Sequence, residues 1–390
     1  MTHSTHNEGI STTILHSGYT PHDTDGAIIP PLHLSSTFLS GNSEGYEYSR
    51  SGNPTRRVLE RTLAALDEAH YALAYSSGSA VLANIATLLK HDEEFLFSSD
   101  AYGGTYRYIA TTFEKQSRTY HIGDLTDLKA TEELLINSKI KIVWVESPTN
   151  PLLKVSDIRA LAALAHTYGA LLVIDNTFAT PVIQKPLLLG ADIVVYSTTK
   201  YINGHSDSIG GSLAVNDKKL YEELVFLQNA IGSILSPFDS WLTLRGLRTL
   251  ELRMERHVKN AQAIAGLLQG HDKVKRVYYP QFFTGEQGEI VARQMRSPGA
   301  ILSIELDERY DVQTFLGSLV YFPLAESLGG IDSLIDHPAT MTHASIPAAE
   351  RKKIGLSDNL LRISVGIENQ DDLLRDIAQA LDSTQPVREG

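Results

Sequence analysis

The sequence predicts an α/β fold in which a large domain with a mostly parallel sheet precedes a smaller α+β domain. Near-continuous apolar runs at 171–174 and 193–196 follow helical patterns, which is typical of parallel strands covered on both faces. After about residue 250 the strand-like runs alternate apolar and polar residues instead. The chain has 390 residues, 42% of them hydrophobic and 21% charged, so it can form two cores of ordinary globular composition.

Composition excludes several classes of function. Cysteine is absent, which removes disulfides, thiolate metal sites and cysteine nucleophiles. A formal charge of −12 gives no support to a nucleic-acid or anionic-membrane partner. No apolar run is long enough to cross a bilayer, and residues 1–9 do not resemble a secretory signal. We therefore expect a cytoplasmic enzyme that acts on a small molecule.

The chain divides by composition into three parts. Residues 1–55 are rich in Gly, Pro, Ser and Thr, and such an arm has little core of its own, so we expect it to lie on another surface. We expect Thr55 to cap an amphipathic helix at 56–69. The large domain then covers 56–250, and the C-terminal α+β domain covers 251–390.

The remaining elements follow from periodicity. We expect strands at 71–75, 94–98, 139–146, 171–175, 193–196, 274–279, 300–306 and 360–365, and helices at 80–90, 158–168, 257–270 and 371–381. The strands at 300–306 and 360–365 alternate, so we expect one of their faces to be exposed.

A strand, a turn of small residues and a helix follow one another between 71 and 90. The turn is Ser76-Ser-Gly-Ser79, and its free N–H groups together with the helix dipole favour an anion such as a phosphate. Close packing of the turn is the alternative explanation.

One lysine stands at the end of a buried strand. The strand at 193–196 runs into Ser197-Thr-Thr-Lys200, and an irregular loop with Gly204 follows. In parallel sheets, polar residues at the carboxyl ends of strands line the ligand crevice, where Glu146 and Asp175 also fall. A lysine whose pKa is lowered attacks carbonyls and forms a Schiff base. A lysine that merely extends from the strand end to solvent is the alternative.

Together, Lys200 and Asp175 point to pyridoxal 5′-phosphate (PLP). Its ring nitrogen needs an adjacent anion to stay protonated and withdraw electrons. The turn with Gly78 and Ser79 would receive the phosphate, helped by the hydroxyls of Ser197 and Thr199. Tyr102 lies in a loop from which an aromatic ring could stack on the cofactor; anchoring of that loop is its alternative role.

The chain resembles the Cys/Met-metabolism PLP enzymes, a family that includes the cystathionine γ-lyases and γ-synthases. The resemblance covers nearly the whole chain, and the lysine motif is its most specific part. The matching motifs, in family order, are Arg50-Ser-Gly-Asn-Pro-Thr, Tyr102-Gly-Gly-Thr, Glu146-Ser-Pro-Thr-Asn-Pro, Asp175-Asn-Thr, Ser197-Thr-Thr-Lys-Tyr-Ile-Asn-Gly-His-Ser-Asp and Ala325-Glu-Ser-Leu-Gly-Gly.

The resemblance implies a PLP-dependent transferase fold (aspartate aminotransferase-like, fold type I), and a homotetramer of two active dimers in which the arm reaches the neighbouring subunit. It implies that Lys200 forms the Schiff base and, with Tyr102, moves protons. The cofactor-binding residues it implies are Tyr48, Arg50, Gly78, Ser79, Tyr102, Asp175, Thr177, Ser197, Thr199 and Lys200. The substrate-binding residues it implies are Asn150, Glu326, Ser327 and Arg362.

The resemblance also bears on the reaction. Glu326 resembles an acidic residue of the enzymes that handle cystathionine. The loop with Gly104 differs from that of the methionine γ-lyases, which has a cysteine there. The sequence pattern at 342–347 resembles the γ-lyases slightly more than the γ-synthases. We expect α,γ-elimination of L-cystathionine to L-cysteine, 2-oxobutanoate and ammonia, with a side activity that releases hydrogen sulfide from cysteine or homocysteine. A γ-synthase is the alternative, and a β-lyase or a methionine γ-lyase is disfavoured.

The sequence disfavours two further classes of function. A non-catalytic ligand-binding protein would not need lysine, aspartate, tyrosine and arginine together. A Rossmann-type dehydrogenase is disfavoured because no Gly-x-Gly-x-x-Gly motif follows a strand in this chain. We expect no metal, because His337 and His343 have no evident acidic or thiolate partners.

Overall fold

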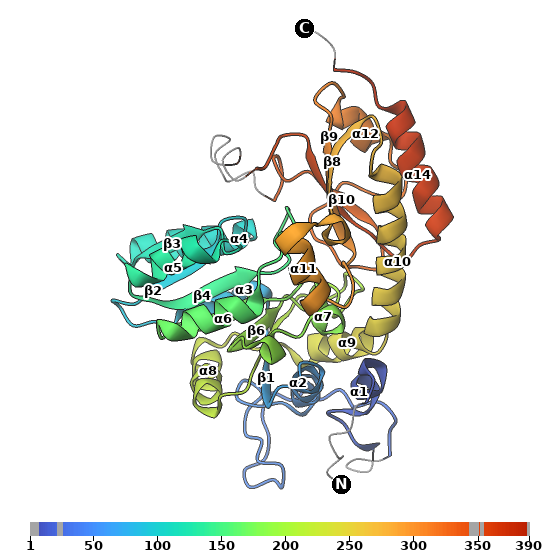
Figure 1. Cartoon of the computed structure of the whole chain (residues 1–390). Coiled ribbons are helices and arrows are strands. Elements are labelled where there is room, and N and C mark those ends of the chain that lie inside the picture. Colours follow the sequence, from blue (N-terminus) through green and yellow to red (C-terminus); the bar gives the residue numbers. More distant parts are fainter. Residues whose placement is uncertain (1–7, 22–25, 343–350, 352–354, 388–390) are drawn as a thin grey trace.

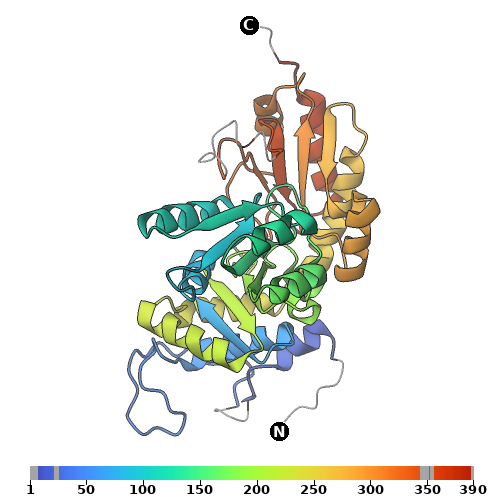
Figure 2. The ribbon, with the colours of Figure 1, turned by 60° about the vertical axis from the view of Figure 1, so that its left-hand side comes forward.

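The structure is a computed structural model that describes residues 8–21, 26–342, 351 and 355–387. Two sheets form its framework (Figure 1). In a second view, turned about the vertical axis, the strands of the smaller sheet, orange to red, lie above the larger sheet (Figure 2). Within the described residues, no helix is both long and apolar enough to span a membrane.

The larger sheet has seven strands within the described residues, in the order β1-β7-β6-β5-β4-β2-β3. Strands β6, β5, β4, β2 and β3 run parallel, whereas β7 pairs antiparallel with both β6 and β1. The predicted mostly parallel sheet is confirmed. Its strands are β1 (Tyr71–Tyr75), β2 (Glu94–Ser98), β3 (Tyr120–Gly123), β4 (Ile140–Glu146), β5 (Leu171–Asp175), β6 (Ile193–Tyr196) and β7 (Gly211–Val215).

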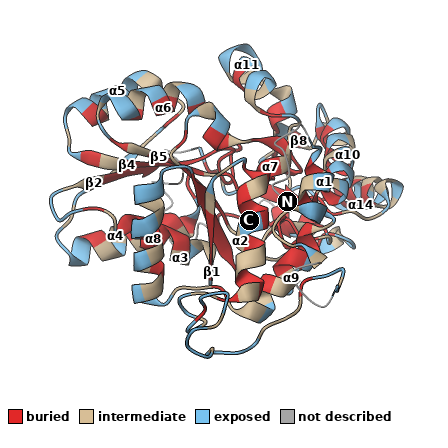
Figure 3. Cartoon of the chain, turned by 90° about the horizontal axis from the view of Figure 1, so that it is seen from below, coloured by how far each residue is buried: buried red, intermediate tan, exposed pale blue. Residues whose placement is uncertain are grey.

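Helices cover both faces of this sheet because successive strand residues point to opposite sides. Phe95, Phe97 and Trp144 belong to the core beneath one helix layer, while Leu96 and Val143 belong to the core beneath the other. The view from below shows buried strands between the two layers (Figure 3). The covering helices are α3 (Gly78–Ala86), α4 (Gly103–Lys115) and α8 (Lys218–Ile231) on one side, and α5 (Leu128–Ile136) and α6 (Ile158–Thr167) on the other.

The N-terminal part packs on neighbouring helices, and it differs from one expectation, the helix cap. Helix α1 (Ile10–His16) buries Ile10 and Ile14 against neighbouring helices, so the arm contributes to a core. Helix α2 (Pro54–Leu66) is capped by Asn53, whose side chain accepts the N–H groups of Thr55 and Arg56. The predicted Thr55 cap is wrong, because the Thr55 hydroxyl instead bonds to Pro31 and His33 in the preceding segment.

The smaller sheet has the order β10-β11-β9-β8 within the described residues, and all its pairs are antiparallel. The long helix α10 runs alongside it (Figure 1). The strands of this half are β8 (Val274–Tyr278), β9 (Ile301–Leu306), β10 (Leu334–Asp336) and β11 (Leu360–Ser364), and its helical segments are α10 (Leu250–Leu268), α11 (Gly285–Gln294), α12 (Val312–Ser318), α14 (Gln370–Ser383) and η3 (Pro280–Phe282). Three other helical segments precede it in the chain: α7 (Thr180–Ile183) and η2 (Pro186–Leu189) lie between β5 and β6, and α9 (Pro237–Leu247) lies between α8 and α10.

The expectation that β9 and β11 have an exposed face is wrong. Both strands are buried throughout, although their residues do alternate. Leu361 and Ile363 belong to the apolar core shared with α10 and α14, whereas Arg362 and Ser364 make hydrogen bonds on the opposite face. The polar face is buried because the larger lobe covers it, and this face forms one wall of the site described below.

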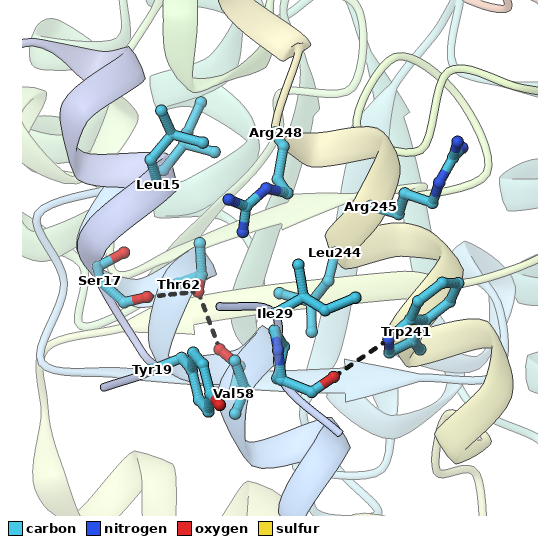
Figure 4. A pocket seen from close by; sticks show the side chains of 12 residues that line it. Leu15, Ser17, Tyr19, Ile29, Val58, Thr62, Trp241, Leu244, Arg245 and Arg248 are labelled. Atoms are coloured by element: carbon cyan, nitrogen blue, oxygen red, sulfur yellow. Dashed lines mark hydrogen bonds between the residues drawn. The ribbon is translucent and has the colours of Figure 1, made fainter. Parts of the chain in front are cut away.

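A cavity of about 250 Å³ lies where the N-terminal segment meets α2 and α9 (Figure 4). Trp241 donates its indole N–H to the carbonyl of Pro30 over 3.2 Å, and the Thr62 hydroxyl lies 3.2 Å from the carbonyl of Ser17. These bonds tie the segment to both helices. None of the predicted site residues lines this cavity.

Candidate active site

A second cavity of about 310 Å³ lies at the carboxyl ends of β4, β5 and β6, beneath the polar face of the smaller sheet. It contains every predicted site residue except Tyr48 and Arg50. The predicted residues that line it are Gly78, Ser79, Tyr102, Asn150, Asp175, Thr177, Ser197, Thr199, Lys200, Glu326, Ser327 and Arg362. The fold therefore brings together residues that are spread over most of the sequence.

One end of the cavity has the features of an anion cradle. The Ser77 side chain caps α3 by accepting the N–H of Ala80 over 3.0 Å, which directs the first turn of the helix into the cavity wall. A Cβ at Gly78 would lie 3.2 Å from the Cβ of Ser197, so glycine keeps this turn close to the end of β6. The Thr199 hydroxyl donates to the carbonyl of Gly210 and accepts its N–H, which holds the loop in place.

Asp175 presents a carboxylate from the end of β5. One of its oxygens accepts both the N–H of Thr177, over 3.0 Å, and the Thr177 hydroxyl, over 2.6 Å. The same hydroxyl accepts the N–H of Ser197, so it links the ends of β5 and β6. Burial raises the pKa of Asp175, and the two Thr177 bonds oppose that rise. The second Asp175 oxygen has no protein partner among the described residues, which suits a protonated ring nitrogen.

Lys200 enters the cavity from the loop that follows β6. Its Nζ donates to the Oγ of Ser327 over 2.6 Å. Burial and, to a smaller extent, the positive charge of Arg362 lower the pKa of Lys200 to about 8, whereas the negative charge of Glu326 opposes this change. An amine with this pKa has a substantial uncharged fraction near neutral pH, which is the nucleophilic and basic form.

Arg362 is an almost fully buried cation at the far wall. Its two terminal nitrogens donate to the Asn150 side chain and to the Ser327 carbonyl, each over 2.9 Å. Asp336 lies 3.5 Å from one of these nitrogens, and the exposed fractions of the two side chains are 2% and 1%. Burial lowers the pKa of Arg362, and the negative charge of Asp336 opposes that fall. The hydrogen bonds to Asn150 and Ser327 fix the position of the guanidinium at the cavity. Sequence reasoning missed Asp336, although the β10–β11 register pairs it directly with Arg362.

The loop before β10 adds Glu326 and Ser327. Ser327 has φ of +87°, a conformation that costs energy for a residue other than glycine. This backbone lets the Ser327 hydroxyl face Lys200 while its carbonyl faces Arg362. Glu326 is exposed at the same cavity. The loop thus places an acidic group beside the two cations.

Arg253 holds the loop after Lys200 and was also missed. It extends from α10 and donates to the carbonyls of Tyr201, Ile202 and Gly246. A Cβ at Gly204 would lie 2.0 Å from the Arg253 Nη1, and Gly204 has a φ of +72°. His205 Nδ1 lies 2.7 Å from the Asn203 carbonyl, so His205 takes part in the structure of this loop. A lone arginine in a helix carries no sequence signal for this task.

Tyr48 and Arg50 lie outside this cavity. Both are exposed, and Arg50 donates to the Asn229 carbonyl over 2.7 Å. Their predicted action in a neighbouring subunit therefore stays a prediction.

Two other expectations concern metals and the 342–347 loop. The described part of the chain contains no cluster of three or more His, Asp or Glu residues able to hold a metal. His337 is a packed loop residue, with ring nitrogens near Thr340 and the Asp358 carbonyl. His343 and the rest of the 342–347 pattern beyond Thr342 lie outside the described residues.

The residues present fit PLP. A helix N-terminus with small residues matches a phosphate, a carboxylate matches a ring nitrogen, and a lysine of lowered pKa matches an aldehyde carbon. Tyr102, 43% exposed at the cavity, offers an aromatic ring for stacking.

Comparison with known proteins agrees with this fit. Residues 11–382 match the family model described as Cys/Met metabolism PLP-dependent enzyme. The chain is 50% identical to the cystathionine γ-lyase of Dictyostelium discoideum, over 96% of this chain and 98% of the relative. It is 47% identical to the cystathionine β-lyase of Coxiella burnetii, over 95% of this chain and 97% of the relative.

A solved structure of cystathionine γ-synthase from Xanthomonas oryzae pv. oryzae, in complex with cystathionine, superposes with a TM-score of 0.93. Its sequence identity is 42%, and the match covers 97% of this chain and 99% of that one. The predicted fold class and cofactor are thereby confirmed. These three relatives are named for three different activities, γ-lyase, β-lyase and γ-synthase, and their identities to this chain are 50%, 47% and 42%.

Proposed function

Because the chain belongs to the Cys/Met-metabolism PLP-dependent enzymes, we propose that it is a cystathionine γ-lyase. The reaction cleaves L-cystathionine to L-cysteine, 2-oxobutanoate and ammonia, and we propose release of hydrogen sulfide from cysteine or homocysteine as a side activity. The observation that supports an enzyme of cystathionine is Glu326, which adds an exposed carboxylate to a cavity that also contains Lys200 and Arg362. The sequence pattern at 342–347 favours a γ-lyase over a γ-synthase.

The protein would bind its cofactor with the residues that line the cavity. We assign Gly78, Ser79, Ser197 and Thr199 to the phosphate, Asp175 and Thr177 to the ring nitrogen, and Lys200 to covalent attachment. The chemistry supplied by bound PLP is electron withdrawal, which acidifies the hydrogens on the α- and β-carbons of the substrate.

The chain's own residues would orient the substrate and move its protons. Arg362, held by Asn150, would bind the α-carboxylate through two parallel hydrogen bonds. Lys200, in its uncharged form, would take the proton from Cα, and Ser327 would keep the Nζ in place through the 2.6 Å bond. Tyr102 would stack on the ring and share in the proton transfers.

Glu326 would distinguish the substrate. Cystathionine is an amino acid at both ends, and its distal ammonium group is a suitable partner for a carboxylate at the cavity. Glu326 lies close enough to Lys200 and Arg362 to affect the pKa of both, so it belongs to the same electrostatic site. Two cations would otherwise repel that ammonium group.

We also propose a homotetramer of two active dimers, in which Tyr48 and Arg50 contact the phosphate in the neighbouring subunit, and a cytoplasmic location. The assembly rests on the family resemblance and the location on the sequence. The exposure of both side chains is compatible with the assembly.

The deciding experiment is incubation of the PLP-loaded protein with L-cystathionine alone, followed by product identification. Cysteine with 2-oxobutanoate is the expected result. Homocysteine with pyruvate would instead show a β-lyase, the activity of the Coxiella burnetii relative. Intact cystathionine, together with consumption of both substrates in a parallel incubation with cysteine and an O-acylhomoserine, would show a γ-synthase, the activity named for the protein from Xanthomonas oryzae pv. oryzae.

A further inference from the structure

One buried carboxyl group in the cavity has no role in the reaction described above. Glu146 ends β4, and the parallel register pairs it with Asp175 at the end of β5. Only 5% of Glu146 is exposed, and that part lines the cavity. Its Oε1 accepts the backbone N–H of Tyr102 over 2.7 Å. Glu146 thus connects the sheet directly to the residue proposed to stack on the cofactor.

Tyr102 has few other constraints. It precedes the first turn of α4, and its own side chain makes no capping hydrogen bond. Its carbonyl accepts N–H groups from Thr105 and Tyr106, which belong to the same helix. Within the described residues, the bond to Glu146 is therefore the one hydrogen bond that ties Tyr102 to the sheet. The Tyr102 ring covers Gly104, where a Cβ would lie 2.2 Å from the ring.

The electrostatics of the carboxyl pair agree with a positioning task. Burial and the neighbouring Asp175 hold the pKa of Glu146 well above its usual range. Among the described residues, Asp175 accepts two stabilising hydrogen bonds from Thr177, whereas Glu146 accepts one, from a backbone N–H. Asp175 therefore takes the negative charge of the pair, and a neutral Glu146 still accepts the N–H of Tyr102.

We propose that Glu146 is a positioning residue, whose carboxyl oxygen fixes the backbone of Tyr102 and thereby places the Tyr102 ring against the cofactor. The inference rests on the proposed function for the location of PLP in this cavity. It assigns Glu146 no contact with the reacting atoms.

The test compares Glu146→Ala with Glu146→Gln. Glutamine keeps an oxygen that accepts the N–H of Tyr102, whereas alanine removes it. We expect Glu146→Ala to weaken PLP binding to the apoprotein and to lower kcat, each by about 10-fold or more. It should also alter the visible circular dichroism of bound PLP, which reports ring placement. Glu146→Gln should stay within about 3-fold of the wild type in both quantities.

A double-mutant cycle with Tyr102→Ala tests whether Glu146 acts through Tyr102. In the Tyr102→Ala background, we expect Glu146→Ala to change PLP affinity by less than about 2-fold. Glu60→Ala is the matched control, because the Glu60 carboxylate also accepts a backbone N–H, that of Ala74 over 3.0 Å, but lies outside the cavity. It should lower the melting temperature without changing the dichroism of bound PLP.

Two results would overturn the proposal: effects of Glu146→Ala that simply add to those of Tyr102→Ala, or equal losses in the alanine and glutamine variants with melting temperatures unchanged. PLP affinity and dichroism do not depend on the product formed. If the wild type binds PLP but forms other products, the γ-lyase assignment fails while the test of Glu146 remains valid.

Discussion

The Nζ of Lys200 donates a 2.6 Å hydrogen bond to the Oγ of Ser327, which is 127 positions further along the chain. This contact joins the loop after β6 of the larger sheet to the loop before β10 of the smaller one. Ser327 in turn offers its carbonyl to Arg362, on the neighbouring strand β11. The proposed nucleophile and the proposed carboxylate receptor therefore share one residue, and each half of the molecule supplies part of the site.

Replacement of Lys200 by alanine should abolish the reaction and leave the fold intact. General acid–base catalysis contributes about 100- to 10,000-fold, so we expect a loss of at least that order, together with loss of the visible absorbance of covalently held PLP. Lys141→Ala is the control, because the Lys141 amine contacts the carbonyls of Tyr168 and Gly169 away from the cavity. Wild-type turnover by the Lys200 variant would refute its assignment.

The pH dependence of cofactor capture should follow Lys200. Its pKa is lowered by burial to about 8, so the amine is mostly protonated below this pH and mostly uncharged above it. The rate at which apoprotein captures PLP, measured by stopped-flow absorbance, should therefore rise with pH and level off above about 8. A midpoint of the capture rate at a pH of about 10, the ordinary pKa of an exposed lysine, would contradict the lowered pKa of Lys200.

The same experiment has an internal check on electrostatics. Glu326 raises the pKa of Lys200, in opposition to burial. Glu326→Gln removes that negative charge, and the midpoint for PLP capture should then shift to lower pH. An upward shift would show that the carboxylate does not stabilise the protonated amine.

Glu326→Ala should impair cystathionine cleavage selectively. A hydrogen bond to a charged group contributes about 1.5–3 kcal/mol, so we expect kcat/KM for L-cystathionine to fall about 10- to 150-fold. Elimination from substrates without a distal ammonium group should change much less. Equal losses on both kinds of substrate would exclude recognition of the distal ammonium by Glu326.

Arg50 should act in a neighbouring active site. Arg50→Ala and Lys200→Ala chains would each be inactive alone, because each lacks one necessary group. Mixed assemblies contain sites with an intact Lys200 and an intact Arg50 from different chains, so co-expression should restore activity above that of either variant. Absence of restoration in verified mixed assemblies would place Arg50 in its own subunit's site. An Arg50→Ala enzyme that is active by itself would place Arg50 outside the reaction.

The sequence by itself determined the class of fold, the family and most of the residues in the cavity. Apolar strands at 171–174 and 193–196 predict buried parallel strands, because both faces of such strands must be apolar. The turn at 76–79 and the lysine motif are local patterns, so they can be recognised in the sequence without knowledge of any long-range contact. Asp175 and Lys200 follow because neighbouring parallel strands bring their carboxyl ends to one edge.

Only the tertiary structure decided which polar groups are paired and which faces are buried. The alternation in β9 and β11 suggests an exposed face, but the larger lobe covers that face and turns it into a wall of the site. Three residues have roles that depend on partners far along the chain. Asp336 lies beside Arg362, 26 positions away, and Arg253 donates to the carbonyl of Tyr201, 52 positions away. Glu146 accepts the N–H of Tyr102, 44 positions away. A pattern of residue types does not specify such pairs, because the hydrogen bonds form only when distant strands, helices and loops are packed together.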